Sequence, residues 1–350
     1  MKYLYYLSLV LLLLSCQRAP KENIYYIMGD AQGTTYNITY IAQRPIEKKE
    51  VDSLLQVIDL SMSTYIDNSL ISKINKGENL PIDPHFEKVL SASMDIYKQS
   101  NDSFDPSIGQ LINAWGFGKK ENHTPPTQKQ IDSLLTLTGM DKVHIVTTGE
   151  GVFVKKDNPN IQLNFNAIAQ GYTSDVIADY FRSKQISNFI VEVGGELAIY
   201  GKNILKDKSW RIGIDNPLQK PDEDREIVAT VELKDCGLAT SGNYRKLWTD
   251  SLTGQKYVHT INPKTGRPQP SNLLSATVIA PSAMLADGYA TTLMALGGLE
   301  KAKAFLATHK DLKAILLYAD DQHKDKIQRY VTENFEVHFE PLSLSPSPSE

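Results

Sequence analysis

The segment SAMLADGYATTLMALGG, residues 282–298, constrains the fold more than any other part of the 350-residue chain. Small or apolar side chains lie on nearly every side of the helix that it predicts, so this helix is expected to be mostly buried. Asp287 lies inside it. A buried carboxylate is costly unless it is paired, hydrogen-bonded or bound to a metal. No Lys or Arg occurs between Arg267 and Lys301 to pair with it locally.

Asp287 and Thr291 are four residues apart, which places a carboxylate and a hydroxyl on one face of the helix. Two oxygen ligands of this kind suit a hard cation such as Mg²⁺, which fills its remaining positions with water and substrate phosphates. The alternative is local: Asp287 caps or bonds within its own helix, and Thr291 returns its hydroxyl to the carbonyl one turn back.

The composition is that of an ordinary globular protein, with 41% apolar and 22% charged residues. The net charge is -4 and no block of five or more like charges occurs, which argues against a nucleic-acid partner. The length suffices for one large domain or two smaller ones.

The first residues, MKYLYYLSLVLLLLSCQRAP, carry Lys2 and then an apolar run that is too short for a comfortable membrane span. The LLSC at its end resembles a bacterial lipobox, so residues 1–16 are expected to be a signal peptide with a lipidated Cys16. An ordinary signal peptide cut near Ala19 is the alternative. We expect an exported bacterial lipoprotein, membrane-anchored and facing the periplasm or the cell exterior. Only Cys236 then remains, which excludes an internal disulfide.

The mature chain divides into a tether at 17–23, a folded part at 24–340 and a Ser- and Pro-rich tail at 341–350. β-branched or alternating runs predict strands at 34–42, 142–149, 151–156, 189–195, 210–214, 225–233, 275–280 and 313–318. Helical patterns occur at 46–63, 84–100, 127–139, 166–184, 282–298 and 298–310. Because strands cluster and do not alternate strictly with helices, an α+β fold is expected.

Two segments offer backbone groups to an anion. GLATSGNY, residues 237–244, has a Gly-x4-Gly frame without the Lys-Ser/Thr that completes a P-loop, so it is interpreted as an anion-binding nest or as a plain turn. Asn164 and Asn166 lie just before a helix, either as caps or at an anion site, and Gly171 allows a close approach.

Two further candidates are a histidine and an aromatic group. His259 ends a strand and precedes an Asn-Pro-Lys-Thr-Gly turn, where a His can act as a general base or be an ordinary half-buried residue. Tyr65, Trp115 and Phe117, the last two beside glycines, can form a slot for a flat ring system or simply pack in the core. The chain has no GxGxxG after a strand, no HExxH and no Cys/His zinc spacing.

The order of these segments resembles one family, the FAD:protein FMN transferases, or ApbE family. The matching segments are QGTTYNITY, MSTYIDNSLISKIN, FDPSIGQLINAWGFG, NFNAIAQGYTSDVIADY, VEVGGELAIYG, GLATSGNYRK, HTINPKTGRP and SAMLADGYATTLMALG. Together they extend from Gln32 to about Gly298.

The resemblance implies a T-fold-like α+β domain of mixed sheets and packed helices, with a flavin cleft between sub-domains. It implies Mg²⁺-dependent transfer of FMN from FAD to a Thr or Ser hydroxyl of an exported acceptor protein, with release of AMP. The implied metal ligands are the Ala167 carbonyl and the side chains of Asp287 and Thr291, and His259 is the implied base. Implied FAD contacts are Gln32, Tyr65, Trp115, Gly116, Phe117, Asn164, Gln170 and a turn at Thr240, Ser241 and Gly242.

Three residues depart from the family pattern: Gln32 stands where Met is common, Asn164 where Asp is common, and Gln170 where Lys or Glu is common. These replacements are neutral, and three alternatives to the transferase stay open. An FAD pyrophosphatase would use water as the acceptor and yield FMN and AMP. A flavin-binding lipoprotein would hold FAD without chemistry, and a structural surface lipoprotein would ignore FAD.

Overall fold

The computed structural model describes residues 21–119, 124–219, 225–242, 247–250, 253–269, 271–319, 327–333 and 335–340. The expected signal peptide at 1–16, the tether as far as residue 20 and the tail at 341–350 lie outside these ranges, so the expected Cys16 anchor is not described. None of the helices in the described ranges has the length and apolar character needed to cross a membrane.

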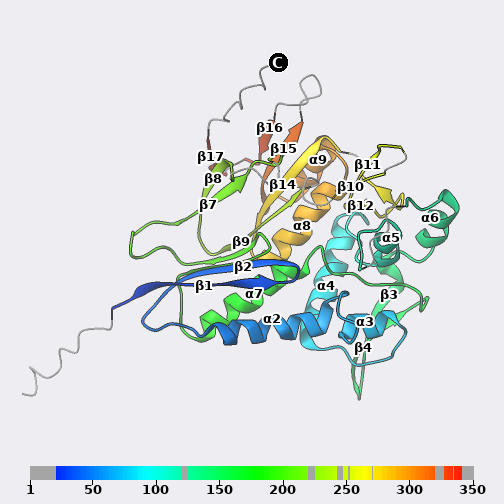
Figure 1. Ribbon diagram of the computed structural model, residues 1–350, viewed down its shortest axis with the longest axis horizontal. Helices are drawn as coiled ribbons and strands as arrows, with labels where there is room; N and C mark the ends of the chain where they lie inside the picture. The colour runs from blue at the N-terminus through cyan, green and yellow to red at the C-terminus, as the bar shows by residue number, and fades with distance from the viewer. Residues whose placement is uncertain are drawn as a thin grey trace, which may run out of the picture.

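An antiparallel sheet of eight strands runs through the molecule in the order β1-β2-β5-β6-β9-β14-β15-β16 (Figure 1). Its strands are β1 (Asn23–Ala31), β2 (Thr34–Ala42), β5 (Phe189–Val193), β6 (Glu196–Tyr200), β9 (Cys236–Gly242), β14 (Leu273–Ala280), β15 (Lys313–Ala319) and β16 (Ile327–Val331). The order is not sequential, so segments far apart in the chain meet in this one sheet.

The β1–β2 hairpin turns through only two residues, Gln32 and Gly33. Both have positive φ angles, 52° and 75°, as a type I′ turn requires. Gly tolerates this backbone readily, whereas Gln adopts it at a cost. The tight turn holds Gln32 at the tip of the hairpin.

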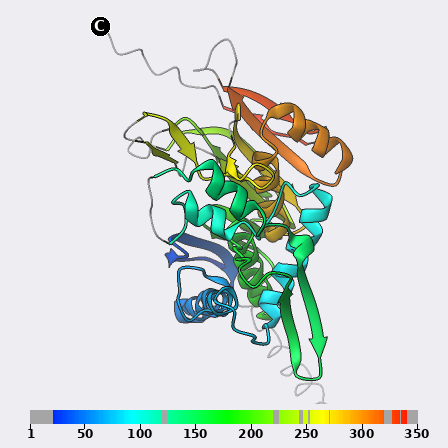
Figure 2. The same cartoon turned by 90° about the vertical axis from the view of Figure 1, so that its right-hand side faces the viewer.

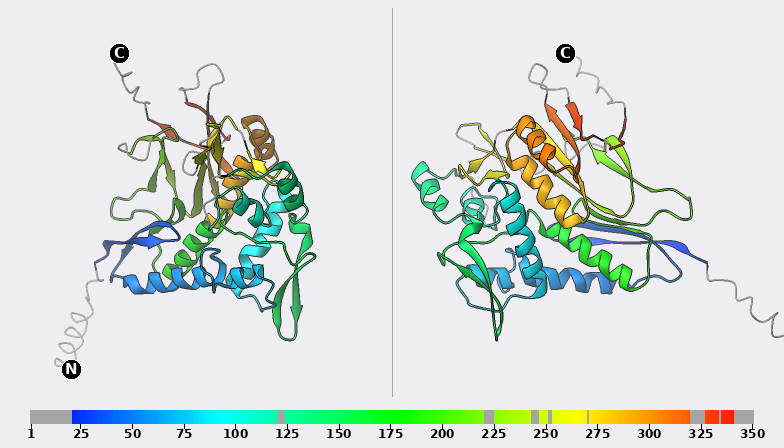
Figure 3. Two further views of the ribbon diagram at one scale, coloured as in Figure 1. Left: turned by 45° about the vertical axis from the view of Figure 1, so that its right-hand side comes forward. Right: turned by 180° about the vertical axis from the view of Figure 1, so that it is seen from behind.

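Helices cover one face of the sheet, with α7 (Ala169–Ser183) and α8 (Ala283–Ala295) packed directly on it (Figures 1 and 3). Outside them lie α2 (Lys48–Met62), α3 (Leu70–Asn75) and α4 (Pro84–Gln99), and α9 (Leu299–Thr308) packs on β15. In α8, 11 of the 13 residues are buried, because β9, β14, α7 and α4 surround it. The expected burial of this helix is confirmed.

A second, three-stranded sheet covers the other face in the order β17-β8-β7. It consists of β7 (Trp210–Asp215), β8 (Ile227–Leu233) and β17 (His338–Phe339). An apolar layer that includes Ile199, Ile212, Ile279 and Ile315 joins the two sheets. Burial of such side chains contributes roughly 25 cal/mol per Å² and is the main force that holds the layers together.

A smaller region beside α8 carries its own apolar cluster, built around Leu111, Trp115, Ile131, Trp248 and Ile261. It contains α5 (Gly109–Ala114), α6 (Gln128–Leu135), β10 (Leu247–Thr249), β11 (Lys256–Val258), β12 (Ile261–Asn262) and β13 (Arg267–Pro268). The 3-10 helix η1 (Met140–Lys142) leads into the hairpin of β3 (Val143–Thr148) and β4 (Gly151–Lys156), which projects from the body in Figure 2.

The predicted α+β fold is confirmed, but no strand was predicted at β1, which begins within the expected tether, or at β6, and one further segment differs from its prediction. Residues 236–242 form strand β9 and not a turn or nest. β9 pairs with β6 on one side and β14 on the other, and Thr240 lies opposite Thr277, with the two hydroxyl oxygens 2.9 Å apart. The small residues of this segment fit a strand at the sheet centre, because a Cβ at Gly237 would lie 2.1 Å from the backbone nitrogen of Ala283.

Candidate functional site

One cleft gathers most of the residues singled out from the sequence. It has a volume of about 350 Å³ and lies between the hairpin tip, the start of α7, the end of β9, α8 and the loop at 259–263. The predicted residues that line this cleft are Gln32, Tyr65, Phe117, Asn164, Ala167, Gln170, Thr240, Ser241, Gly242, His259, Asp287 and Thr291. These residues span 260 positions of sequence, from 32 to 291, and only the fold brings them together.

Asp287 lies in the wall of this cleft with only 5% of its surface exposed. Its Oδ2 atom accepts a 3.1 Å hydrogen bond from the backbone N–H of Gly171 in α7. No ion pair to Asp287 occurs among the residues that the structure describes. The local alternative is therefore wrong, since the cap of α8 is Ser282, which accepts from Leu285.

The contact between Gly171 and Asp287 affects a third group, the carbonyl of Ala167. Gly171 is four residues beyond Ala167, so its N–H is the donor that a regular helix would direct to this carbonyl. Because the N–H goes to Asp287, the Ala167 oxygen has no hydrogen bond within the described part of the chain. A carbonyl oxygen without a donor is thus presented at the cleft beside α8.

Thr291 lies one helical turn beyond Asp287 and also faces the cleft. Its Oγ1 is 3.2 Å from the Oγ of Ser241 at the end of β9. The hydroxyl that returns to the carbonyl one turn back is that of Thr292, which donates to Gly288 over 2.8 Å. Thr291 therefore keeps its oxygen on the cleft side, as the metal interpretation requires.

Burial raises the pKa of Asp287, and the negative charge of Asp175 raises it further, against the opposing effect of the Gly171 N–H. An ionised carboxylate with a single hydrogen bond is expensive at such a site. A bound cation would remove most of that cost. The buried position of Asp287 is thus unfavourable for an empty site and favourable for an occupied one.

The oxygens of Ala167, Asp287 and Thr291 fit a hard cation such as Mg²⁺, which accepts carboxylate, hydroxyl and carbonyl ligands. No group of three or more His, Cys, Asp or Glu side chains suited to a metal occurs in the described ranges. With these three ligands, the cation would have one protein carboxylate and would complete its coordination shell with water and phosphate oxygens.

The approach to α7 is shaped by Asn164, Asn166 and Tyr65. The Asn164 Oδ1 accepts the Asn166 N–H at 2.9 Å in a local turn, whereas the N-cap of α7 is Ile168, so the predicted capping role is wrong. The Asn164 side-chain oxygen is thus occupied by this hydrogen bond, and the Asn164 NH₂ group makes no hydrogen bond within the described ranges. Asn166 reaches the hydroxyl of Tyr65, 3.4 Å away, and the Tyr65 ring is 45% exposed at the cleft. An exposed ring suits stacking against a flat ligand.

Gln32 and Gln170 form another part of the wall. The Gln32 Nε2 donates to Thr173 of α7 over 2.9 Å, which ties the hairpin tip to this helix. The Gln170 amide packs against Gly194, where a Cβ would lie 2.7 Å from the Gln170 nitrogen. Both neutral side chains are therefore held in place by their neighbours.

His259 follows β11 and lines the cleft, as expected from the sequence. Its ring meets that of Phe117 edge to face, with centroids 6.4 Å apart. Both rings line the cleft.

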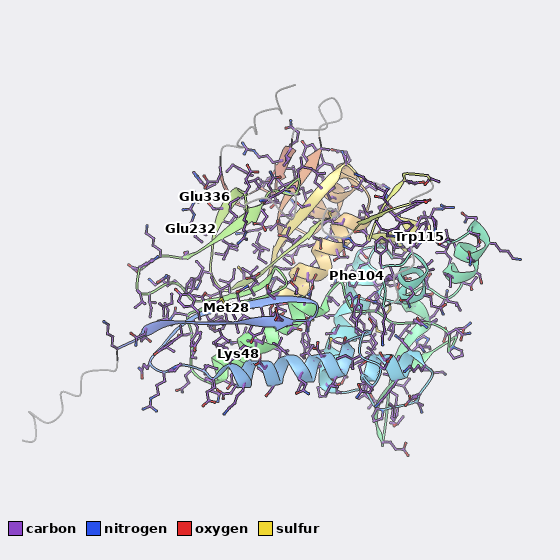
Figure 4. The ribbon with its side chains drawn as sticks, in the orientation of Figure 1. Met28, Lys48, Phe104, Trp115, Glu232 and Glu336 are labelled. Atoms are coloured by element: carbon purple, nitrogen blue, oxygen red, sulfur yellow. The ribbon has the colours of Figure 1, made fainter. Side chains whose placement is uncertain are left out.

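Trp115 and Gly116 are the predicted contacts that the structure does not bring to the cleft. Trp115 is 1% exposed, and its indole nitrogen donates to the Gly266 carbonyl over 2.7 Å. Figure 4 shows it among α5 and the neighbouring short strands, whereas Phe104 lies nearer α8. The core alternative is right for the Trp115 side chain, and Gly116, with a φ of 78°, provides the turn after α5.

Two buried acids in the cleft wall, Asp105 and Glu196, were not among the predicted residues. The Oδ1 of Asp105 accepts from both the N–H and the hydroxyl of Ser107, and burial raises its pKa to about 6. Each lies in a mostly apolar segment, FDPSI and GGELAI, so the argument applied to Asp287 would have found them.

Comparison with known proteins gives consistent matches over most of the chain. A family model described as the ApbE family matches residues 32–316. The chain is 33% identical over 321 residues to the FAD:protein FMN transferase of Haemophilus influenzae, covering 89% of this chain and 90% of that protein. The enzyme of the same name from Vibrio cholerae is 33% identical over 328 residues, covering 91% and 94%.

Solved structures agree. The flavin transferase ApbE from Vibrio cholerae superposes with a TM-score of 0.77 at 31% identity, covering 90% of this chain and 99% of that one. The apo form of the Pseudomonas stutzeri flavinyl transferase ApbE gives 0.76 at 28%, covering 89% and 95%. With the motifs, the fold and the cleft in agreement, the chain belongs to the ApbE family.

Proposed function

We propose that this protein is an FAD:protein FMN transferase that moves FMN from FAD to a Thr or Ser hydroxyl of an acceptor protein and releases AMP. Relatives that carry this name match the chain over nearly its whole length. The observation that carries the proposal is the convergence of Asp287, Thr291, the Ala167 carbonyl and His259 on one cleft.

In the proposed reaction, the acceptor hydroxyl oxygen forms a bond to the phosphorus of the FMN moiety. The bond between that phosphorus and the bridging oxygen breaks, and AMP leaves with the bridging oxygen. The hydroxyl proton passes to a ring nitrogen of His259, because an alcohol is a poor nucleophile at neutral pH without a base.

Asp287, Thr291 and the Ala167 carbonyl would hold Mg²⁺. When bound there, the ion supplies charge neutralisation at the diphosphate and at the leaving AMP. The chain's own contribution is to keep these three oxygens on one side of the cleft and His259 on another. The exposed Tyr65 ring and the Phe117 ring offer surfaces for the flavin or the adenine.

Purified protein, FAD, MgCl₂ and an acceptor fragment test the proposal, with a fluorescent acceptor band on a denaturing gel as the readout. We expect labelling by the parent protein and none by Asp287→Asn, which keeps the side-chain volume but removes the charge. No labelling by the parent with several acceptors would refute the transferase proposal.

An FAD pyrophosphatase is the second candidate, and it is favoured by the neutral Gln32, Asn164 and Gln170 in the cleft wall. Water then replaces the acceptor hydroxyl, and the products are FMN and AMP. Chromatography of the products without an acceptor separates the two activities. Release of FMN at the rate of transfer favours the pyrophosphatase, and intact FAD favours the transferase.

We also propose that Cys16, which lies outside the described residues, anchors the protein to a membrane through a lipid. The support is the LLSC sequence after a short apolar run. Mass spectrometry of the protein purified from membranes tests this proposal. A lipidated N-terminal Cys16 is the expected product, and an unmodified N-terminus near Ala19 would contradict it.

A further inference from the structure

Asp175, on α7, contacts the first turn of the helix that carries Asp287. Its Oδ1 accepts the Ala283 N–H and its Oδ2 accepts the Met284 N–H, each at 2.9 Å. Both carboxylate oxygens are thus bound to the N-terminus of α8, where the helix dipole favours negative charge.

Asp175 forms one of two hydrogen-bonded contacts, one turn apart, by which α7 meets α8. Gly171, one turn earlier in α7, donates its N–H to Asp287, which lies one turn beyond Ala283 in α8. The helices approach so closely here that a Cβ at Gly171 would be 2.3 Å from the Ala283 carbonyl oxygen. Two contacts spaced one turn apart on each helix fix both the rotation and the height of α8 against α7.

Asp175 caps α8 from another helix, because it accepts the N–H groups of Ala283 and Met284, which the side chain of Ser282 does not bind. The helix has its own cap in Ser282, whose Oγ accepts from Leu285 at 3.3 Å. Burial raises the pKa of Asp175 to about 6 in spite of its two N–H donors, so the carboxylate occupies an unfavourable position. Because the acceptor lies on α7 and the two donors lie on α8, this capping contact also joins the two helices.

We propose that Asp175 is a positioning residue for the cation site, because it holds α8 against α7 so that the Asp287 carboxylate and the Ala167 carbonyl keep a fixed separation. This inference rests on the proposed cation site. The Asp287 carboxylate belongs to α8, whereas the Ala167 carbonyl lies two residues before α7, so their separation follows the packing of the two helices. Asp175 controls that packing without lining the cleft.

The proposal predicts which cation loses more affinity when the contact between Asp175 and α8 is weakened. Mg²⁺ demands near-ideal octahedral geometry at about 2.0–2.1 Å, whereas Ca²⁺ tolerates longer and more irregular coordination. A looser α8 should therefore weaken Mg²⁺ binding more than Ca²⁺ binding. A merely structural role would lower the melting temperature and leave the ratio of the two affinities unchanged.

The test is titration calorimetry of Mg²⁺ and Ca²⁺ into the FAD-free protein, at a temperature well below the melting transition of every variant. Asp175→Asn keeps the volume and one acceptor oxygen but places an amide NH₂ against the other of the two N–H groups. We expect the Kd for Mg²⁺ to rise about tenfold or more, as is typical when a group that orients metal ligands is removed. We expect a smaller rise for Ca²⁺.

Two control variants accompany it. Ser282→Ala removes the acceptor of the Leu285 N–H and the side-chain contact of Ser282 with Asp175, but keeps the bonds from the Ala283 and Met284 N–H groups to Asp175. It should lower the melting temperature with the Kd for Mg²⁺ within twofold of the parent. Asp179→Asn removes an exposed carboxylate one turn further along α7, which pairs with Arg182 at the surface, and should leave both quantities unchanged.

Parent-like Mg²⁺ affinity and Mg²⁺-to-Ca²⁺ ratio in a folded Asp175→Asn variant would overturn the positioning role while leaving the cation site in place. If Asp287→Asn binds Mg²⁺ as the parent does, the cation site itself is wrong, and both proposals fall. If Asp175→Asn does not fold, Asp175→Glu replaces it in the test, because Glu keeps the charge and both acceptors but adds a methylene. A higher Kd for Mg²⁺ in this variant supports the positioning role. An unchanged Kd overturns it.

Discussion

Replacing Gly171 by Ala adds a single methyl group at the closest approach of α7 and α8. The new Cβ would lie 2.3 Å from the Ala283 carbonyl oxygen and 2.8 Å from the Asp287 Cβ, whereas an ordinary contact begins at 3.4 Å. The obstacle is helix backbone, which cannot rotate away as a side chain would. The helices must therefore separate by roughly 1 Å, the difference between 2.3 and 3.4 Å.

Two opposing terms set the change in the free energy of unfolding. Ala is favoured over Gly inside a helix by about 1 kcal/mol. Overpacking of a tight core contact typically costs about 1–3 kcal/mol. We expect a net destabilisation of about 1–2 kcal/mol, since the clash involves backbone. Separation by 1 Å also lengthens the 3.1 Å contact between the Gly171 N–H and Asp287, and a displacement of that size near reacting groups costs about 100-fold in rate.

Urea unfolding followed by circular dichroism measures the first quantity, and acceptor labelling at saturating FAD measures the second. Gly288→Ala is the matched control on α8, since its Cβ would clash only with the Cδ1 end of Ile96, at 2.5 Å, and would meet Ile168 at an ordinary 3.5 Å. The Ile96 side chain can change its rotamer. We expect the control to keep activity within about threefold, because α8 need not move. A Gly171→Ala protein with parent-like stability and turnover would refute the close-packing argument.

Three further predictions concern other residues of the cleft and its surroundings. His259→Asn should lower FMN transfer by about 10²–10⁴-fold with FAD affinity nearly unchanged, and equal loss of binding would contradict its role as a base. Trp115→Phe should leave FAD affinity within about twofold, measured by fluorescence titration, while unfolding becomes easier by about 1–3 kcal/mol because the Gly266 carbonyl loses its donor. Burial raises the pKa of Asp105 from 3.8 to about 6, so the folded protein binds more protons than the unfolded one between these values, and this group makes stability fall as pH rises from about 4 to 6. In denaturant titrations, the free energy of unfolding of Asp105→Asn should fall less than that of the parent over this pH range, by up to about 3 kcal/mol. Identical pH profiles of the two proteins would contradict the assignment.

Local patterns predicted the long elements well. The burial of α8 follows from its apolar surface, and the predicted helices at 46–63 and 84–100 correspond to α2 and α4. Gly171 was expected to allow a close approach, and the Ala283 carbonyl provides it. These features depend on residues near one another in the chain, where periodicity and small side chains are informative.

Long-range pairing was harder to predict. Residues 236–242 look like a turn because they are rich in Gly, Ala, Ser and Thr, yet they form a central strand. Their side chains are small because β9 packs tightly beneath α8, which leaves no room for larger ones. Trp115 was expected at a flavin slot because of the glycine beside it. It is buried in an apolar cluster instead, and the partner of its indole nitrogen is the Gly266 carbonyl, 151 residues away in sequence. No local pattern contains such a partner.

The central claim is that a divalent cation, held by Asp287, Thr291 and the Ala167 carbonyl, organises the diphosphate of FAD for cleavage. Anomalous diffraction from crystals grown with Mn²⁺ and FAD tests it most directly. The expected result is a peak about 2.0–2.2 Å from one oxygen of each of these three groups, with the diphosphate completing the coordination shell. A peak elsewhere, with Asp287 still bonded only to the Gly171 N–H, would contradict the account.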